Sequence, residues 1–139
     1  KGVVLSSGPG DPQNCPETID TAKKLIENNV PTLGICLGAQ IIGIAGNTET
    51  YKLKYGHRGG NQPVKDVKTE DVYITSQNHG FALHKLPKNI KETFINLNDG
   101  TCEGISGENC WSVQFHPEAA PGPMDANILF EKVGEMING

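Results

Sequence analysis

In Gly34-Ile35-Cys36-Leu37-Gly38, a cysteine has a glycine two residues away on either side. Residues 30–35 form a short apolar run typical of a buried strand, and residues 37–45 carry apolar side chains at helical spacing. A glycine-flanked residue between a strand and a helix is typical of a nucleophile elbow, a tight turn that projects one side chain beyond the end of a sheet. The stretch therefore predicts an α/β fold with Cys36 at the carboxyl end of a strand.

The residues that precede this stretch show the same order of strand and helix. Residues 3–5 are apolar and predict a strand. Residues 16–28 carry apolar side chains at helical spacing, begin with a proline and end at an asparagine, which predicts a helix with one buried face. Two successive strand–helix units imply parallel strand pairing.

The second half of the chain has a different pattern. Between residues 49 and 113, short alternating runs are separated by Gly and Asn turns, which predicts mixed or antiparallel strands. The clearest runs are 72–75, 94–97 and 111–115. Apolar side chains at helical spacing over residues 125–137 predict a last amphipathic helix.

Length and composition describe one ordinary globular domain. The 139 residues suffice for one hydrophobic core, and no apolar run is long enough to span a bilayer. The formal net charge of -4 arises from scattered residues, so we expect neither a nucleic-acid nor a membrane partner. Four cysteines without a CxxC pair indicate the reducing cytoplasm. Because the chain begins inside a predicted strand, we expect it to be part of something longer.

Cys36 is the candidate nucleophile. Only about 3% of an ordinary thiol is ionised at neutral pH, so a catalytic cysteine needs assistance. The helix expected to begin at Leu37 offers positive potential and free N–H groups beside the thiol. The alternative is that Cys36 is a small buried residue, which is what most intracellular cysteines are.

His116 and Glu118 are the candidate partners of Cys36. They flank Pro117 directly after an apolar run, and residues two apart in extended backbone point to the same side. A Cys–His pair oriented by a carboxylate is an arrangement for acyl transfer. The alternative is a plain strand exit with a solvated carboxylate. The sequence contexts of His57 and His84 predict surface residues.

A third candidate lies in the loop Gly8-Pro9-Gly10, which follows the first predicted strand. Open α/β sheets bind their ligands at the carboxyl ends of strands. Backbone N–H groups of this loop, with that of Leu37, could form an oxyanion hole. The loop lacks the Gly-Lys-Ser/Thr ending of a phosphate loop, and a simple turn is the alternative.

Three segments together, 5–12, 34–40 and 116–118, resemble the class I glutamine amidotransferase family. Segments 54–64, 77–81 and 116–125 are similar to the glutaminase subunit of the carbamoyl phosphate synthases within that family. The chain departs from the family pattern at Ala39, where histidine is usual, and at Ser7, where asparagine is usual.

The resemblance implies a flavodoxin-like open mixed sheet with flanking helices that lacks the family's first strands. Residues 1–139 would then be an N-terminally truncated glutaminase domain. It further implies that Cys36 attacks glutamine, with His116 and Glu118 completing a triad and a γ-glutamyl thioester as intermediate. The residues implied to bind the substrate or its oxyanion are Gly8, Gly10, Leu37, Gln40, Asn78, Gly80 and Phe81.

The same resemblance implies a partner. Ammonia would pass to a large synthetase subunit, or a fused equivalent, that uses ATP and metal to make carbamoyl phosphate for pyrimidine and arginine biosynthesis. This chain itself would bind no nucleotide, metal or other cofactor. The alternatives are the glutaminase component for anthranilate or guanylate synthesis, a non-catalytic regulatory domain of the family, or an unrelated cysteine hydrolase with a similar elbow.

Overall fold

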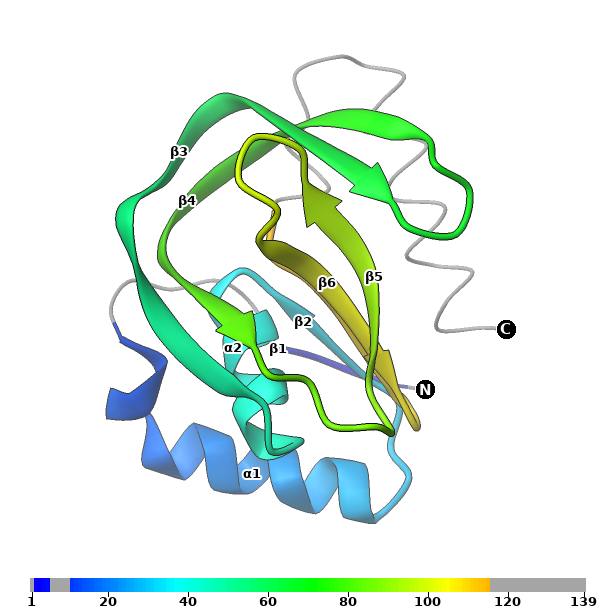
Figure 1. The fold of residues 1–139 in the computed structure, drawn as a ribbon. Coiled ribbons are helices and arrows are strands. Elements are labelled where there is room, and N and C mark those ends of the chain that lie inside the picture. The colour runs from blue at the N-terminus through cyan, green and yellow to red at the C-terminus, as the bar shows by residue number, and fades with distance from the viewer. Residues whose placement is uncertain (1, 6–10, 116–139) are drawn as a thin grey trace.

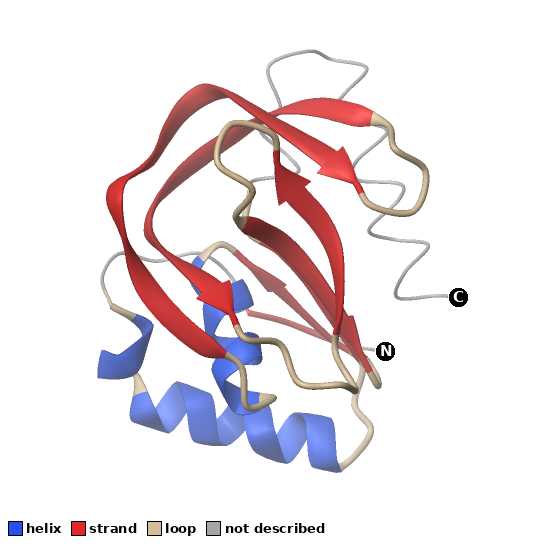
Figure 2. Ribbon diagram, in the orientation of Figure 1, coloured by secondary structure: helices blue, strands red, loops and turns tan. Residues whose placement is uncertain are grey.

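The computed structural model of the chain describes residues 2–5 and 11–115, which form one mixed sheet with helices packed against it (Figures 1 and 2). The described strands are β1 (Val3–Leu5), β2 (Thr32–Ile35), β3 (Glu49–Asp66), β4 (Val72–His84), β5 (Lys91–Asn96), β6 (Cys102–Gly107) and β7 (Cys110–Val113). The described helices are η1 (Pro12–Asn14), α1 (Pro16–Glu27) and α2 (Leu37–Ala45). The predicted helix at 125–137 lies outside the described residues.

The sheet has a parallel part and an antiparallel part. Its strand order is β1-β2-β7-β6-β4-β3-β5, and β2 pairs in parallel with both β1 and β7. The pairings among β3, β4, β5, β6 and β7 are antiparallel, and β5 pairs with β6 as well as with β3. The strands β6, β4, β3 and β5 therefore close on themselves, which Figure 1 shows as a curled layer beside the parallel strands. The predicted α/β class, the parallel start and the antiparallel second half are confirmed.

Strand β3 is much longer than the sequence indicated. Its middle contains Gly56, Gly59 and Pro63, which read as turn residues, yet all lie within the strand. The pairing of β3 with β4 shifts register twice, between Lys52 and His57 and again after Gly59. These irregularities accommodate the positive φ of Gly56 and Gly59, so the chain bends without leaving the sheet.

Two hydrophobic clusters hold the layers together. One joins the two parts of the sheet, where the rings of Phe94 and Phe115 meet edge to face with centroids 5.2 Å apart. The other packs Ile42 of α2 against Leu83 and Ile105 of the sheet. This cluster thus packs α2, the helix that follows Cys36, against the sheet.

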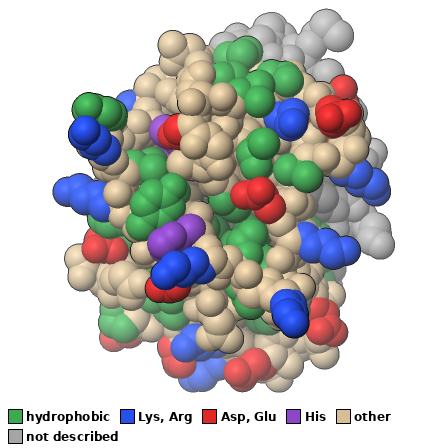
Figure 3. Space-filling view, viewed as in Figure 1, with side chains coloured by type: hydrophobic (Ala, Val, Ile, Leu, Met, Phe, Trp, Pro, Cys, Tyr) green, Lys and Arg blue, Asp and Glu red, His purple; other side chains and the backbone are tan. Residues whose placement is uncertain are grey.

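Surface features agree with the charge pattern of the sequence. Acidic and basic side chains are intermixed over the face shown in Figure 3. Among the described residues, no helix is long and apolar enough to cross a membrane.

Candidate active site

Cys36 occupies the tight turn that the sequence predicted. Strand β2 ends at Ile35 and α2 begins at Leu37, so Cys36 is the single residue between them. Its φ of 57 and ψ of -109 are unusual for a residue with a side chain, and such strain is concentrated at functional sites. A methyl group on Gly34 would overlap the carbonyl group of Gly38, and one on Gly38 would overlap the carbonyl oxygen of Leu5. Both glycines are therefore required by close backbone approach.

The thiol of Cys36 lies at the amino end of α2 and faces β4. Its Sγ donates to the carbonyl oxygen of Asn78 at 3.8 Å, and its backbone N–H donates to Val113 at 3.0 Å. Leu37 is the first residue of α2, where N–H groups have no partner within the helix and carry partial positive charge. The position suits a nucleophile with an oxyanion binder beside it.

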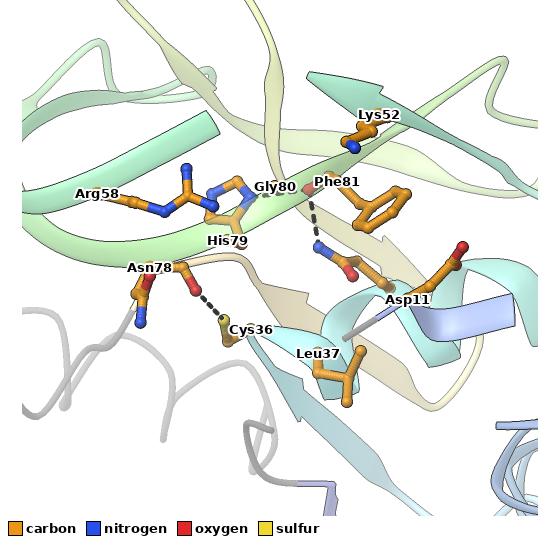
Figure 4. A pocket seen from close by; sticks show the side chains of 10 residues that line it. Asp11, Cys36, Leu37, Lys52, Arg58, Asn78, His79, Gly80 and Phe81 are labelled. Atoms are coloured by element: carbon orange, nitrogen blue, oxygen red, sulfur yellow. Dashed lines mark hydrogen bonds between the residues drawn. The ribbon is translucent and has the colours of Figure 1, made fainter. Parts of the chain in front are cut away.

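Cys36 opens onto a pocket of about 320 Å³, at the small end of the range for ligand sites. Figure 4 shows that the lining comes from the elbow, from α2 and from the paired strands β3 and β4. The residues that line it are Asp11, Cys36, Leu37, Gln40, Lys52, Arg58, Asn78, His79, Gly80 and Phe81. The structure thus brings together every predicted site residue that it describes. The others, Gly8, Gly10, His116 and Glu118, lie outside the described residues.

Gln40 joins α2 to β4 at the floor of the pocket. Its side chain is 2% exposed, and its Nε2 donates to the carbonyl oxygen of Phe81 at 2.8 Å and to Oε1 of Gln114 at 3.1 Å. Both amide hydrogens are therefore used within the protein. Of its side chain, the carbonyl oxygen is the part left for a substrate.

Behind the pocket wall lies a buried polar network that the sequence analysis missed. The expectation that His57 is a surface residue was wrong, because it is 5% exposed. Its Nε2 lies 2.6 Å from Asp99, and its Nδ1 lies 3.2 Å from Glu103 and 3.0 Å from the amide oxygen of Gln77. The bend in β3 turns His57 inward, which a turn-like sequence could not reveal. His84, also expected at the surface, is half-buried against Tyr51.

The network fixes a positive charge on His57. Burial alone would lower its pKa, but hydrogen bonds to Glu103 and Asp99 outweigh burial and raise the pKa to about 9. Glu103 is fully buried, and burial raises its pKa in spite of the charge on His57. His57 therefore carries a charge at neutral pH inside the protein.

His79 connects this network to the pocket. Its Nδ1–H donates to the carbonyl oxygen of Phe81 at 2.7 Å, and its Nε2 lies 2.8 Å from the amide of Gln77. Burial is the main reason that its pKa falls to about 4, and the charges of His57 and Arg58 lower it further. His79 is therefore neutral at pH 7, and its ring lies between the side chain of Gln77 and the carbonyl group of Phe81, all within β4.

Three side chains of the same network have potential metal-ligating atoms close together. Ligand atoms of His57, His79 and Glu103 lie within 4.8 Å of one another. The amide of Gln77 contacts all three side chains and occupies the space between them. A metal ion bound by these three side chains would have to displace that amide.

Three charged residues of the pocket were also missed: Asp11, Lys52 and Arg58. The register shifts in β3 place Lys52 opposite Phe81 and Arg58 opposite Asn78. The signal that could have found them is their position in β3, provided that the Gly-rich segment is recognised as a bulged strand that pairs with β4.

Comparison with known proteins assigns the family. A family model described as "Glutamine amidotransferase class-I" matches residues 1–136. The chain belongs to this family. Among curated members, it is 57% identical over 135 residues to a protein named carbamoyl phosphate synthase small chain from Methanocaldococcus jannaschii. It is 50% identical over 141 residues to one of the same name from Polynucleobacter asymbioticus.

These curated amidotransferases are much longer than the chain. The two matches cover 94% and 99% of this chain but only 38% and 36% of the relatives. Among solved structures, a putative GMP synthase protein from Thermoplasma acidophilum superposes with a TM-score of 0.81 at 22% identity, over 99% of this chain and 72% of that one. A glutamine amidotransferase from Thermotoga maritima gives 0.72 at 19% identity, over 97% and 64%. These two likenesses confirm the amidotransferase fold.

Proposed function

We propose that this chain is the glutaminase part of a carbamoyl phosphate synthase and that Cys36 hydrolyses glutamine to glutamate and ammonia. The observation that carries the proposal is the position of Cys36 in a strained elbow that opens onto a pocket. The relatives at 50–57% identity, which share one name, favour carbamoyl phosphate synthesis over the other pathways of the family.

The proposed reaction begins with attack of the Cys36 thiolate on the amide carbon of glutamine. The carbonyl oxygen becomes an oxyanion, which accepts hydrogen bonds from the N–H of Leu37 and from N–H groups of the Gly8 to Gly10 loop. His116 takes the thiol proton and gives it to the leaving nitrogen, so that ammonia departs and a γ-glutamyl thioester remains. Water then attacks the thioester with His116 as base, which releases glutamate and restores the thiol.

The roles of the supporting residues in this proposal rest on different grounds. His116 and its orienting carboxylate Glu118 are assigned from the sequence motif alone. Asn78, Gly80 and Phe81 are assigned from the motif and also line the pocket with Cys36. The peptide groups of β4 face the substrate in this scheme, and the network of His57 and His79 supports that strand from behind.

The proposal includes the destination of ammonia. We infer that a large synthetase chain or fused domain receives it and supplies the ATP and metal sites, in the cytoplasm. This chain then contributes no cofactor chemistry of its own. Ammonia that escapes into neutral water is protonated and is no longer a nucleophile, so the proposed transfer must avoid bulk water.

The test is glutamate release from glutamine, measured with and without a carbamoyl phosphate synthase large chain. We expect Cys36→Ala to abolish release and Cys15→Ala to leave it unchanged. Cys15 is a matched control because its side chain makes no capping hydrogen bond to α1 and does not line the pocket. A folded wild-type protein that releases no glutamate in the presence of the partner would contradict the proposal.

A further inference from the structure

Three strands contribute side chains to the buried polar network behind the pocket. His57 of β3 lies directly opposite His79 of β4, and the centroids of their rings are 4.9 Å apart, edge to face. Glu103 comes from β6. Among the described residues, β4 and β6 are in register only where Leu83 lies opposite Cys102. Side chains rather than backbone therefore connect β4 to β6 at the network.

Each imidazole of the network is oriented by a hydrogen bond at one nitrogen. Nδ1–H of His79 donates to the carbonyl oxygen of Phe81 at 2.7 Å, so Nε2 of this neutral ring carries a lone pair. Nε2 of His57 lies 2.6 Å from the carboxylate of Asp99, and its Nδ1 lies 3.2 Å from Glu103. Histidines that bind metal ions are held in this way, with the second nitrogen donating to a carboxylate or a backbone carbonyl.

The amide of Gln77 lies between these groups and cannot satisfy all of them. Its Oε1 is 2.8 Å from Nε2 of His79, and both atoms are acceptors because His79 is neutral. Exchanging the amide oxygen and nitrogen removes this conflict but brings the oxygen against the carboxylate of Glu103. Two acceptors in contact are costly in a buried site. A cation between them, either a proton or a metal ion, would make the contact favourable.

The distances between the candidate ligand atoms suit a small tetrahedral ion. With bonds of about 2.0 to 2.1 Å, two ligand atoms of a tetrahedral Zn²⁺ site lie about 3.3 Å apart. Nδ1 of His57 is 3.2 Å from Oε1 of Glu103 and 3.0 Å from Oε1 of Gln77. Two imidazoles, a carboxylate and an amide oxygen are also nitrogen and oxygen ligands of the kind that Zn²⁺ binds.

The charges of the network favour a divalent ion over a proton. In the metal-free protein, the proton on His57 faces the carboxylates of Asp99 and Glu103, so the ionised network has an excess of negative charge. A divalent ion in place of that proton makes the network neutral. Neutrality matters here because charge that is removed from water is costly unless it is compensated.

We propose that His57, His79 and Glu103 bind a structural Zn²⁺ ion, with Oε1 of Gln77 as the fourth ligand. The amide of Gln77 turns away from Glu103 to make room, and the ion then joins β6 to β3 and β4. The proposal departs from the expectation, drawn from the sequence, that the chain binds no metal. It does not depend on the glutaminase function, because the ion takes no part in the reaction at Cys36.

The test is metal binding by the full chain, stripped of metal with a chelator and titrated with Zn²⁺ by isothermal titration calorimetry. We expect one ion per chain. Co²⁺ in its place should give the visible absorption of a tetrahedral site without the charge-transfer band of a thiolate ligand, which excludes the four cysteines as ligands. Zn²⁺ should raise the Tm by about 5 to 10 °C when the free ion exceeds its Kd about 100-fold.

Three variants identify the site. Asp99→Asn weakens the group that orients His57, so the Kd for Zn²⁺ should rise about 10- to 100-fold. Glu103→Gln removes a ligand charge with little change of shape and should abolish binding. His84→Gln is the matched control, because His84 packs against Tyr51 outside the cluster, and its Kd should equal that of the wild type.

Several results would overturn the proposal. A wild type that binds neither Zn²⁺ nor Co²⁺ would leave a proton as the cation of the network. A thiolate band in the Co²⁺ spectrum would place the ion elsewhere, as would a Kd that Asp99→Asn leaves unchanged. Circular dichroism checks that each variant is folded. If Glu103→Gln does not fold, the wild-type spectrum and the Kd of Asp99→Asn still decide between a metal ion and a proton.

Discussion

The buried charge on His57 makes stability depend on pH in a predictable direction. Its pKa is about 9 in the folded protein and about 6.5 in an unfolded chain. Because the folded protein binds the proton more tightly, the ionic contribution of His57 is fully present below pH 6.5. It is lost as pH rises from 6.5 through 9.

The size of this effect follows from the difference between the two pKa values. A difference of about 2.5 units at about 1.4 kcal/mol per unit gives about 3 kcal/mol. Asp99 is 42% exposed, so solvent weakens its share, while Glu103 is fully buried and supplies the larger part. We therefore expect the contribution to reach about 2 to 3 kcal/mol.

The assay is urea denaturation of the wild type and His57→Gln at several pH values from 6 to 10, with linear extrapolation to water. At pH 6 the variant should be less stable by the full amount, and the difference should shrink steadily above pH 7. Titratable groups other than His57 and its direct partners contribute equally to the stability of both proteins, so their contributions cancel in this comparison. A difference that stays constant from pH 6 to 10 would show that His57 is not charged in the folded protein, and the network assignment would be wrong.

The elbow, the pocket floor and the core give three further predictions. Gly38→Ala should lower the free energy of unfolding by about 2 to 4 kcal/mol in the same urea assay, because its methyl group must push Leu5 away; a change under about 0.5 kcal/mol would contradict the close approach. Gln40→Leu should cost about 1 to 3 kcal/mol by leaving the Phe81 carbonyl with one partner fewer, and should raise the glutamine KM more than it lowers kcat in steady-state assays. Phe94→Ala should cost about 3 to 5 kcal/mol by calorimetry, since this ring is 1% exposed in the core.

Local sequence patterns predicted the parallel half of the fold. The helix expected over 16–28 is α1 (Pro16–Glu27), the helix expected over 37–45 is α2, and strands β1 and β2 lie where apolar runs placed them. The elbow at Cys36 could be predicted because both of its glycines are close in sequence to the residue that they serve. Such features depend on contacts between residues that are close in sequence, so they can be predicted from the sequence.

The antiparallel half was predicted less completely. Glu49–Asp66 is a single bulged strand where turn residues suggested interruptions, and β7 ends at Val113 although the apolar run continues to Phe115. The inward positions of β4 carry Thr75, Gln77 and His79, a polar alternation that resembles a solvent-facing side. Nothing local distinguishes that pattern from a surface strand.

Local sequence patterns are sufficient to indicate the type and order of the first elements, the elbow around Cys36 and the family that the chain resembles. The closure of β6, β4, β3 and β5 on themselves depends on long-range strand pairing. That closure buries His57 with Glu103 and directs Arg58 toward Gly80. The physical reason is that hydrogen bonds and charges between distant strands determine which polar side chains leave water, and those partners meet only when the sheet is complete.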